Sequence, residues 1–339
     1  MPSLVATLEE IERRENDFDG VRRERIRAVE AITNRPLVIY ATAFLNRVKV
    51  QASGGEVGID GNDKIAFDEV TADLPVDSGL DLLLHSPGGQ PEAAEAIVEL
   101  LRSRFPSLRI IVPDQAKSAA TMMCCAADEI LMDERSELGP IDPQMLITRG
   151  DGQVIFAPAQ AIIDQFDGAK ESLAKNPNHL PAWLPILQPL APSLLMQCES
   201  ADKLARNLVS SWLSRYMFSD IEDGERLANE AAAYLSDSKM HLSHSRRVSI
   251  DQLVDLNFKV IDLRSTPELR DAVWGLYHAI SWTFDRTAAF KIVENGHGAA
   301  FVRQVVTQTI QLPFGQPVPQ QPATPRQESA PKKKRKRGK

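Results

Sequence analysis

The sequence predicts an α/β protein: a parallel sheet with flanking helices. Three short apolar runs, 80–85, 108–112 and 129–132, have the length and character of buried strands. An alanine-rich amphipathic segment, 91–105, separates the first two, and a segment of small residues, 118–127, separates the last two. Strands that alternate with helices in this way run parallel and are joined by right-handed crossovers.

The segments on either side of this centre are predicted from the same periodicities. Residues 1–34 are expected to form a charged helix, because apolar positions recur among Glu and Arg, and Pro36 then ends it. Residues 37–41 are a further apolar run and predict another strand. From Pro158 onward the pattern is helical, so the C-terminal half is expected to be helical. Residues 313–339 are rich in Pro and Gln and predict a disordered tail.

Charge and cysteine content narrow the functional classes. The net charge is -7, although Lys332–Lys339 form a strongly basic terminus, so the rest of the chain is acidic. An acidic body argues against a broad nucleic-acid surface. The tail is expected either to attract anionic partners nonspecifically, nucleic acid or membrane, or only to aid solubility. An odd number of cysteines, two of them adjacent, favours a reducing compartment, and the sequence predicts a cytoplasmic protein.

Membrane, metal and cofactor signals are not found in the sequence. The N-terminus lacks the apolar segment of a signal peptide, and no apolar run reaches the about 18 residues that a membrane span needs. The three cysteines have no zinc-type spacing. The expectation is therefore a protein without a transmembrane segment, metal ion or cofactor.

Two turns carry the candidate chemistry. Ser86-Pro87-Gly88-Gly89 follows one predicted strand, and glycines there let backbone N–H groups face a cleft and stabilise an oxyanion. Ser118 opens the helix after the next strand, where a helix N-terminus favours a developing negative charge. Taken singly, the first motif is also a plain strand-to-helix turn and the second an ordinary serine N-cap. Parallel strands bring both turns to the same sheet edge, where α/β ligand sites lie.

The sequence across about 80–145, LLLHSPGG to AKSAATMMCCAADEILMDERSELGPIDPQ, resembles the ClpP/crotonase superfamily, and within it the SppA-related serine dehydrogenase proteinases. The resemblance is clearest there and extends over most of 35–303, which is taken as one ClpP/crotonase-like serine peptidase domain with helical additions. It implies Ser118 as nucleophile, oxyanion donors from Gly88, Gly89 and Ala119, a peptide or unfolded protein as substrate, and a homo-oligomer.

The general base is the open point of this interpretation. ClpP proteins have a histidine after the next strand, whereas here Asp142 stands at that place, so a ClpP-type Ser-His-Asp triad is not predicted. SppA-like relatives use a Ser-Lys dyad, for which Lys170 is a candidate, although it also reads as a solvated helix charge. His244 lies in a polar stretch and is the preferred candidate over Lys170, because histidine is the residue type whose usual pKa lies near neutral pH.

Two other functions compete with a serine peptidase that works through a Ser118 acyl-enzyme. A crotonase-type acyl-CoA enzyme shares the oxyanion logic but needs no serine. A non-catalytic scaffold with a lapsed site is supported by the missing ClpP-type histidine. Loss of activity in a Ser118→Ala variant would indicate a serine peptidase and not a crotonase-type enzyme. The absence of labelling by a serine-directed probe would favour the non-catalytic scaffold.

Overall fold

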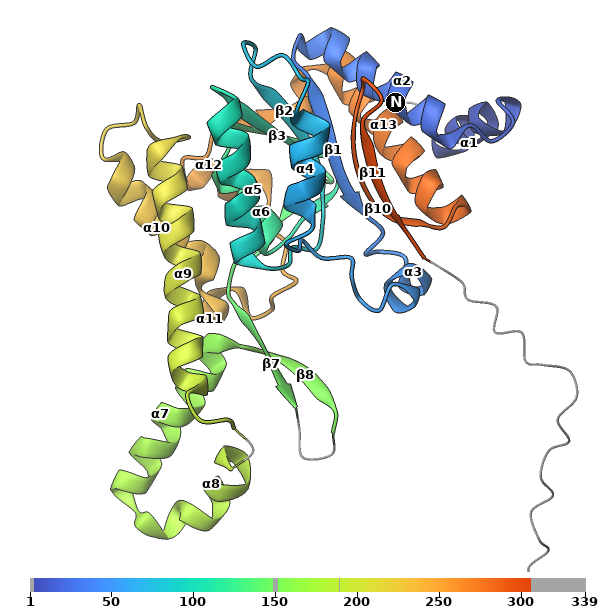
Figure 1. Cartoon of the computed structure of the whole chain (residues 1–339). Coiled ribbons are helices and arrows are strands. Elements are labelled where there is room, and N and C mark those ends of the chain that lie inside the picture. The colour runs from blue at the N-terminus through green and yellow to red at the C-terminus, as the bar shows by residue number, and fades with distance from the viewer. Residues whose placement is uncertain (1–2, 149–151, 189, 306–339) are drawn as a thin grey trace, which may run out of the picture. The chain divides into compact units, whose positions relative to one another are not determined.

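The computed structural model describes residues 3–148, 152–188 and 190–305, and within them a seven-stranded sheet forms the centre (Figure 1). The strand order is β11-β10-β1-β2-β3-β5-β9. The strands are β1 Leu37–Thr42, β2 Leu80–His85, β3 Leu108–Val112, β5 Glu129–Met132, β9 Val260–Asp262, β10 Ala289–Asn295 and β11 Ala300–Gln304.

Five neighbouring strands of this sheet, β1, β2, β3, β5 and β9, run parallel. The predicted parallel sheet with flanking helices is therefore confirmed, and three of its strands have the predicted bounds. The helices that join them are α5 Pro91–Arg104 and α6 Ala119–Cys125. Because all these strands run the same way, the turns after β2 and β3 meet at one edge of the sheet.

The prediction of a helical C-terminal half is corrected by β10 and β11. These strands form an antiparallel hairpin, and β10 pairs with β1 in the sheet. The sequence did not predict β10 as a buried strand, because it contains Lys291 and Glu294 and charged residues are seldom fully buried without a partner. Both have partners here: Lys291 Nζ lies 2.9 Å from Asp63 Oδ2, and Glu294 accepts hydrogen bonds from Arg22 and Arg23.

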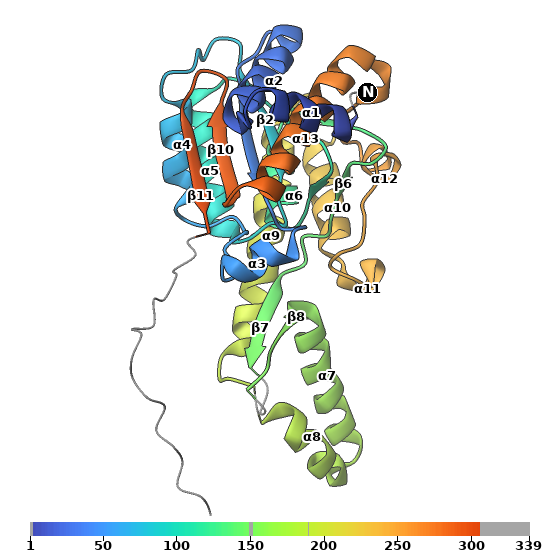
Figure 2. The same cartoon turned by 90° about the vertical axis from the view of Figure 1, so that its right-hand side faces the viewer.

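Helices cover both faces of the sheet, as Figures 1 and 2 show. Alternate residues of β1 and β2 point to opposite faces, so each strand contributes to two apolar cores. The helices on one side are α4 Asp63–Thr71, α5, α6, α9 Leu194–Arg215 and α10 Gly224–Ser236, and those on the other are α2 Phe18–Thr33 and α13 Pro267–Arg286.

The single helix expected within 1–34 is two helices, α1 Leu4–Arg13 and α2. Glu15 and Asn16 adopt positive φ angles of 57° and 65°, which end α1. Asp17 then starts α2, because its side chain accepts a hydrogen bond from the N–H of Gly20 at 2.8 Å.

An insertion after β6 (Glu137–Leu138) builds structure away from the main sheet (Figure 1). It consists of the antiparallel hairpin β7 Gln144–Thr148 and β8 Val154–Pro158, followed by α7 Ala159–Lys175, a short 3₁₀ turn and α8 Leu180–Leu187. Searching the described helices for a stretch long and apolar enough to cross a membrane gives none. The tail predicted to be disordered, 313–339, lies outside the described residues.

Candidate active site

The two candidate turns lie side by side because backbone hydrogen bonds join them. The N–H of Ser86 donates to the carbonyl of Gln115, and the N–H of Lys117 donates to the carbonyl of Ser86, each at 3.0 Å. The short strand β4 (Gln115–Ala116) thus extends the pairing of β2 and β3 beyond the sheet edge. The result is that the SPGG turn is fixed against the residues that precede Ser118.

Gly88 makes the closest approach between the two turns. Its φ is +95°, and a Cβ at this position would lie 2.6 Å from both the Lys117 carbonyl oxygen and Ser118 Cβ, and 2.8 Å from the N of Ala119. Only glycine fits such a backbone without strain. The requirement for glycine here therefore comes from contact with the serine turn.

Ser118 has an unusual backbone and a free side chain. It stands at the N-cap position of α6 with φ 51° and ψ −121°, but its side chain makes no capping hydrogen bond. A non-glycine residue at positive φ is strained, and such strain gathers at functional sites. Ser118 is therefore not an ordinary N-cap residue, because its side chain does not cap α6.

Two backbone N–H groups beside Ser118 are available to a ligand. The N–H of Gly88 is occupied, since it donates to Ser86 Oγ at 3.2 Å. Among the described residues, none accepts a hydrogen bond from the N–H of Gly89 or of Ala119. Both belong to the predicted set of oxyanion donors. Within the SPGG turn, the N–H of Gly89 is therefore available to an oxyanion, whereas the N–H of Gly88 is already used.

His244 comes from a distant loop and is held by a carboxylate. Its Nδ1 lies 2.7 Å from Oδ1 of Asp142, which is only 3% exposed. The second carboxylate oxygen accepts a hydrogen bond from Gln144 Nε2, also at 2.7 Å. With Nδ1–H donated to Asp142, a neutral His244 carries a free lone pair on Nε2.

The role of Asp142 was missed in the sequence. Its position after β6 was counted against a triad, because a histidine stands there in the ClpP pattern. Instead, the structure pairs this carboxylate with a histidine 102 residues further along the chain. A reciprocal pair of backbone hydrogen bonds between Leu138 and Val248, at 3.0 and 3.2 Å, holds the two segments together. Serine, aspartate and histidine therefore occur here in the chain order Ser118, Asp142, His244.

Ser118 and His244 line one cavity of about 700 Å³. Gly89 also lines it, beside Ser118, so a possible oxyanion donor faces the same space. The rest of the wall is largely apolar. Its apolar side chains come from α6, the segment before β7, the strands β7 and β8, and α9: Met122, Ile141, Met145, Phe156, Ala201, Leu204 and Ala205.

Neither Lys170 nor Lys117, the residue before Ser118, lines this cavity. Lys170 lies on α7 with its side chain 77% exposed, and it forms an ion pair with Asp167 at 3.1 Å. Lys117 Nζ points elsewhere, since it donates to the Leu138 carbonyl at 3.0 Å and pairs with Glu137 at 2.8 Å. The geometry places His244, and not Lys170, in the same cavity as Ser118.

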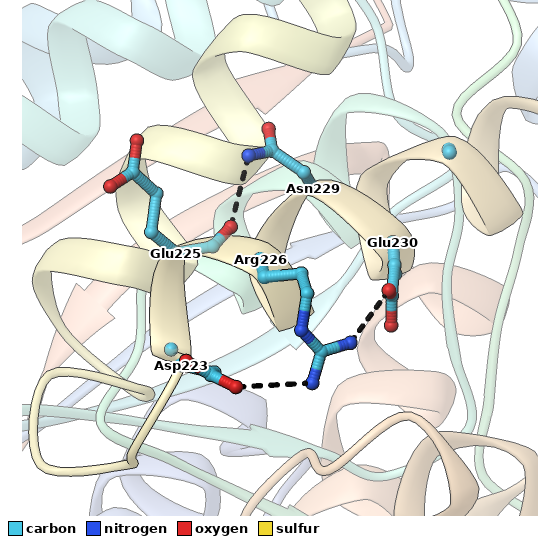
Figure 3. Close-up of a pocket in the computed structure, with 7 residues that line it drawn as sticks. Asp223, Glu225, Arg226, Asn229 and Glu230 are labelled. Atoms are coloured by element: carbon cyan, nitrogen blue, oxygen red, sulfur yellow. Dashed lines mark hydrogen bonds and ion pairs between the residues drawn. The ribbon is translucent and has the colours of Figure 1, made fainter.

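A larger hollow of about 750 Å³ lies along α10, on another part of the surface (Figure 3). Three of its charged side chains pair with one another: Arg226 with Glu230 at 2.7 Å and with Asp223 at 3.6 Å. The dashed lines in Figure 3 mark these pairs. No nucleophile lines it, so this hollow offers no chemistry comparable to that around Ser118.

Metal-binding side chains are not clustered in the described part of the chain, where no group of three or more His, Cys, Asp or Glu is placed to hold an ion. Cys124 and Cys125 are buried in α6, and Cys198 is buried in α9. Burial raises the pKa of the Cys125 thiol, so it is no thiolate nucleophile at neutral pH.

Comparison with known proteins gives a family match over part of the chain. Residues 58–166, about a third of the chain, match the family model of ClpP-like SDH-type serine proteinases. The family resemblance predicted from the sequence is confirmed over this segment. It contains Ser118, both glycines of the SPGG turn and Asp142, whereas His244 lies outside it.

Curated relatives match over a shorter stretch. Two uncharacterized proteins of Methanocaldococcus jannaschii are 45% and 39% identical over 71 residues, which is 21% of this chain and 25% and 24% of theirs. The chain thus matches about a quarter of the length of these relatives. Among solved structures, a mutant of the 1510-N membrane-bound stomatin-specific protease aligns with 62% of this chain and 79% of its own, at 14% identity and a TM-score of 0.36. That likeness is too slight to carry a conclusion.

Proposed function

We propose that this protein is a serine peptidase in which Ser118, His244 and Asp142 form the catalytic triad. The observation that carries the proposal is the cavity that Ser118 and His244 share, with His244 Nδ1 2.7 Å from a buried carboxylate. The match of 58–166 to a serine proteinase family supports the same reaction class. The match alone does not name a base, and the geometry favours His244 over Lys170.

The first half of the reaction acylates the serine. Ser118 Oγ attacks the scissile carbonyl carbon while His244 Nε2 accepts the hydroxyl proton. Asp142 holds the ring in the tautomer with hydrogen on Nδ1 and stabilises the imidazolium that forms. The N–H groups of Gly89 and Ala119 donate to the oxyanion of the tetrahedral intermediate. The intermediate collapses, the C–N bond breaks, and His244 gives its proton to the leaving amine.

The second half hydrolyses the acyl-enzyme. A water molecule loses a proton to His244 Nε2 and attacks the ester carbonyl, and the same two N–H groups stabilise the second oxyanion. Collapse of this intermediate breaks the bond to Ser118 Oγ, which takes back the proton from His244. The carboxylate product leaves, and both residues return to their starting states.

The shape and lining of the cavity favour an extended polypeptide with apolar side chains as substrate. Met122, Met145 and Phe156 offer apolar contacts beside Ser118. A folded domain does not present a strand of backbone to such a cavity, so the substrate is an unfolded or flexible segment.

Hydrolysis of fluorescently labelled casein, an unfolded protein, tests this proposal. Wild-type protein is expected to release fluorescent peptides, and Ser118→Ala is expected to release none above the buffer rate. A matched control is Ser211→Ala on α9, a surface serine outside this cavity. Equal cleavage by wild type and Ser118→Ala would contradict the assignment of the nucleophile, and no cleavage by the wild type would favour a scaffold or a thioester-directed enzyme.

A further inference from the structure

A second cavity, of about 420 Å³, lies at the ends of β1 and β2 and shares no lining residue with the cavity around Ser118. Its polar and aromatic wall comes from β1, the following loop, β2 and α13: Thr42, Asn46, His85, Tyr277, Phe284 and Asp285. Pockets of a few hundred cubic ångströms suit small organic ligands. With about 30 Å³ per water molecule in the liquid, this one has space for roughly 14 non-hydrogen atoms at most.

Thr42 stands in the wall of this cavity and has a buried hydroxyl. The residue is 0% exposed, and within the described residues its Oγ1 has no hydrogen-bond partner. A buried hydroxyl without a partner is disfavoured, and each such group in a native protein needs an explanation. A polar group of a ligand bound beside Thr42 supplies one.

His85 and Tyr277 form a fixed aromatic wall. The N–H of Gln115 donates to His85 Nδ1 at 3.5 Å, which leaves the ring proton on Nε2, 3.5 Å from Tyr277 Oη. Tyr277 Oη in turn donates to Asp114 Oδ2 at 2.9 Å. The rings of His85 and Tyr277 meet edge to face, with centroids 5.0 Å apart. This wall is preorganised, which lowers the entropy cost of binding a flat ligand.

Asp285 sets the charge of the cavity mouth. It accepts one hydrogen bond, from Asn46 Nδ2 at 3.1 Å, and it has no ion pair with any residue that the structure describes. Lys49 is near enough to interact with it electrostatically, but its Nζ donates to the Thr287 carbonyl. No Lys or Arg lines the cavity. The mouth therefore favours a cation over an anion.

We propose that this cavity binds a small organic amine with an aromatic body and a hydroxyl group. The ammonium group pairs with Asp285, the ring packs between Phe284 and Tyr277, and the hydroxyl meets Thr42. The proposal is independent of the peptidase reaction, because binding at this cavity uses none of the triad residues.

Isothermal titration of the full-length protein tests the proposal with three probes of similar size. Tyramine has the amine, the ring and the hydroxyl. Phenethylamine lacks the hydroxyl, and 3-(4-hydroxyphenyl)propionate replaces the amine by a carboxylate. Tyramine is expected to bind best, phenethylamine more weakly, and the propionate not measurably. Each probe is titrated into wild type, Asp285→Asn, Thr42→Val and the control Glu268→Gln, an exposed carboxylate at the other end of α13.

Asp285→Asn is expected to weaken tyramine binding by about tenfold or more, because a hydrogen bond to a charged group is lost. Thr42→Val is expected to bring tyramine down to the affinity of phenethylamine, and Glu268→Gln is expected to change nothing. Asp285 is exposed, so its substitution leaves the fold intact even if Thr42→Val lowers stability. The proposal is overturned if the wild type does not bind tyramine, if it binds the propionate equally well, or if Asp285→Asn binds tyramine like the wild type.

Discussion

His244 Nδ1 lies 2.7 Å from Oδ1 of Asp142, across 102 residues of sequence. The carboxylate is almost fully buried, and the histidine side chain is 28% exposed on the side of the cavity that also contains Ser118. A buried acceptor that fixes one ring nitrogen leaves the other free to exchange a proton with a nucleophile. This pair is the structural basis for assigning His244 as the general base.

Asp142→Asn should keep the fold but lower peptidase activity. An asparagine amide can donate to the ring, which favours the tautomer with hydrogen on Nε2 and removes the base. The expected loss in kcat is about three to four orders of magnitude, as in other serine peptidases with this change. The measurement is casein hydrolysis beside the control Asp167→Asn, which changes an exposed carboxylate on α7 that forms an ion pair with Lys170. Activity within a few-fold of wild type would show that Asp142 does not position the base.

Gly88→Ala should remove activity through the contact between the two turns. A Cβ there meets backbone atoms of Lys117 and Ala119, whereas at Gly55, with a similar φ of +86°, it meets nothing within 4 Å. Each substitution carries the cost of a non-glycine residue at positive φ, roughly 1–3 kcal/mol. Only Gly88→Ala is expected to abolish casein cleavage. Equal activities in the two variants would argue that the SPGG turn tolerates displacement from Ser118.

Ala201→Trp should narrow the cavity without touching the triad. Ala201 is partly exposed on α9 and lines the space beside Ser118, while its neighbour Lys203 is exposed and does not line it. The expected result is a higher KM for apolar peptides, with kcat for a small ester substrate unchanged, and no effect of Lys203→Trp. Steady-state kinetics with both substrates measure these changes. An unchanged KM of Ala201→Trp for apolar peptides would indicate that the substrate does not bind in this cavity.

Burial of His85 should make stability depend on pH. Burial lowers the pKa of His85 to about 3, because the protonated ring loses its hydration there. The unfolded chain binds a proton near pH 6.5, so from there down to about pH 3 unfolding takes up a proton and the folded state loses about 1.4 kcal/mol per pH unit.

Urea unfolding at pH 6 and pH 4 measures this loss, and His85→Gln is the variant that removes the titrating group. The difference in unfolding free energy between the two pH values is expected to be smaller in His85→Gln than in wild type by roughly 2–3 kcal/mol. The same difference in both proteins would mean that His85 takes up its proton equally in the folded and unfolded states.

The sequence predicted the parts of the fold that local pattern determines. The strands β2, β3 and β5 have a continuous apolar run bounded by turns, and each was recognised. The β10 strand was not, because Lys291 and Glu294 read as surface charges until their partners from α4 and α2 are known. Pairings of this kind depend on tertiary structure and leave no periodic signal.

In the candidate site, too, the residues in local motifs were predicted and the pairing that depends on tertiary structure was not. Ser118 and the SPGG turn stand in short motifs of fixed spacing, so the sequence could place them together at one sheet edge. The pair of Asp142 and His244 depends on contact between β6 and the loop before α12 (Ile250–Asp255), and nothing local to either residue indicates it. Lys170 was the second candidate for the base, after His244, and the structure places its side chain in solvent on α7.

The most direct test of the triad is the labelling of purified protein by a fluorophosphonate probe, which reacts only with an activated serine. Wild type and Lys170→Ala are expected to be labelled at the same rate, Ser118→Ala not at all, and His244→Ala at a rate lower by about three orders of magnitude or more. Labelling that persists in Ser118→Ala, or that is lost in Lys170→Ala and kept in His244→Ala, would contradict the account.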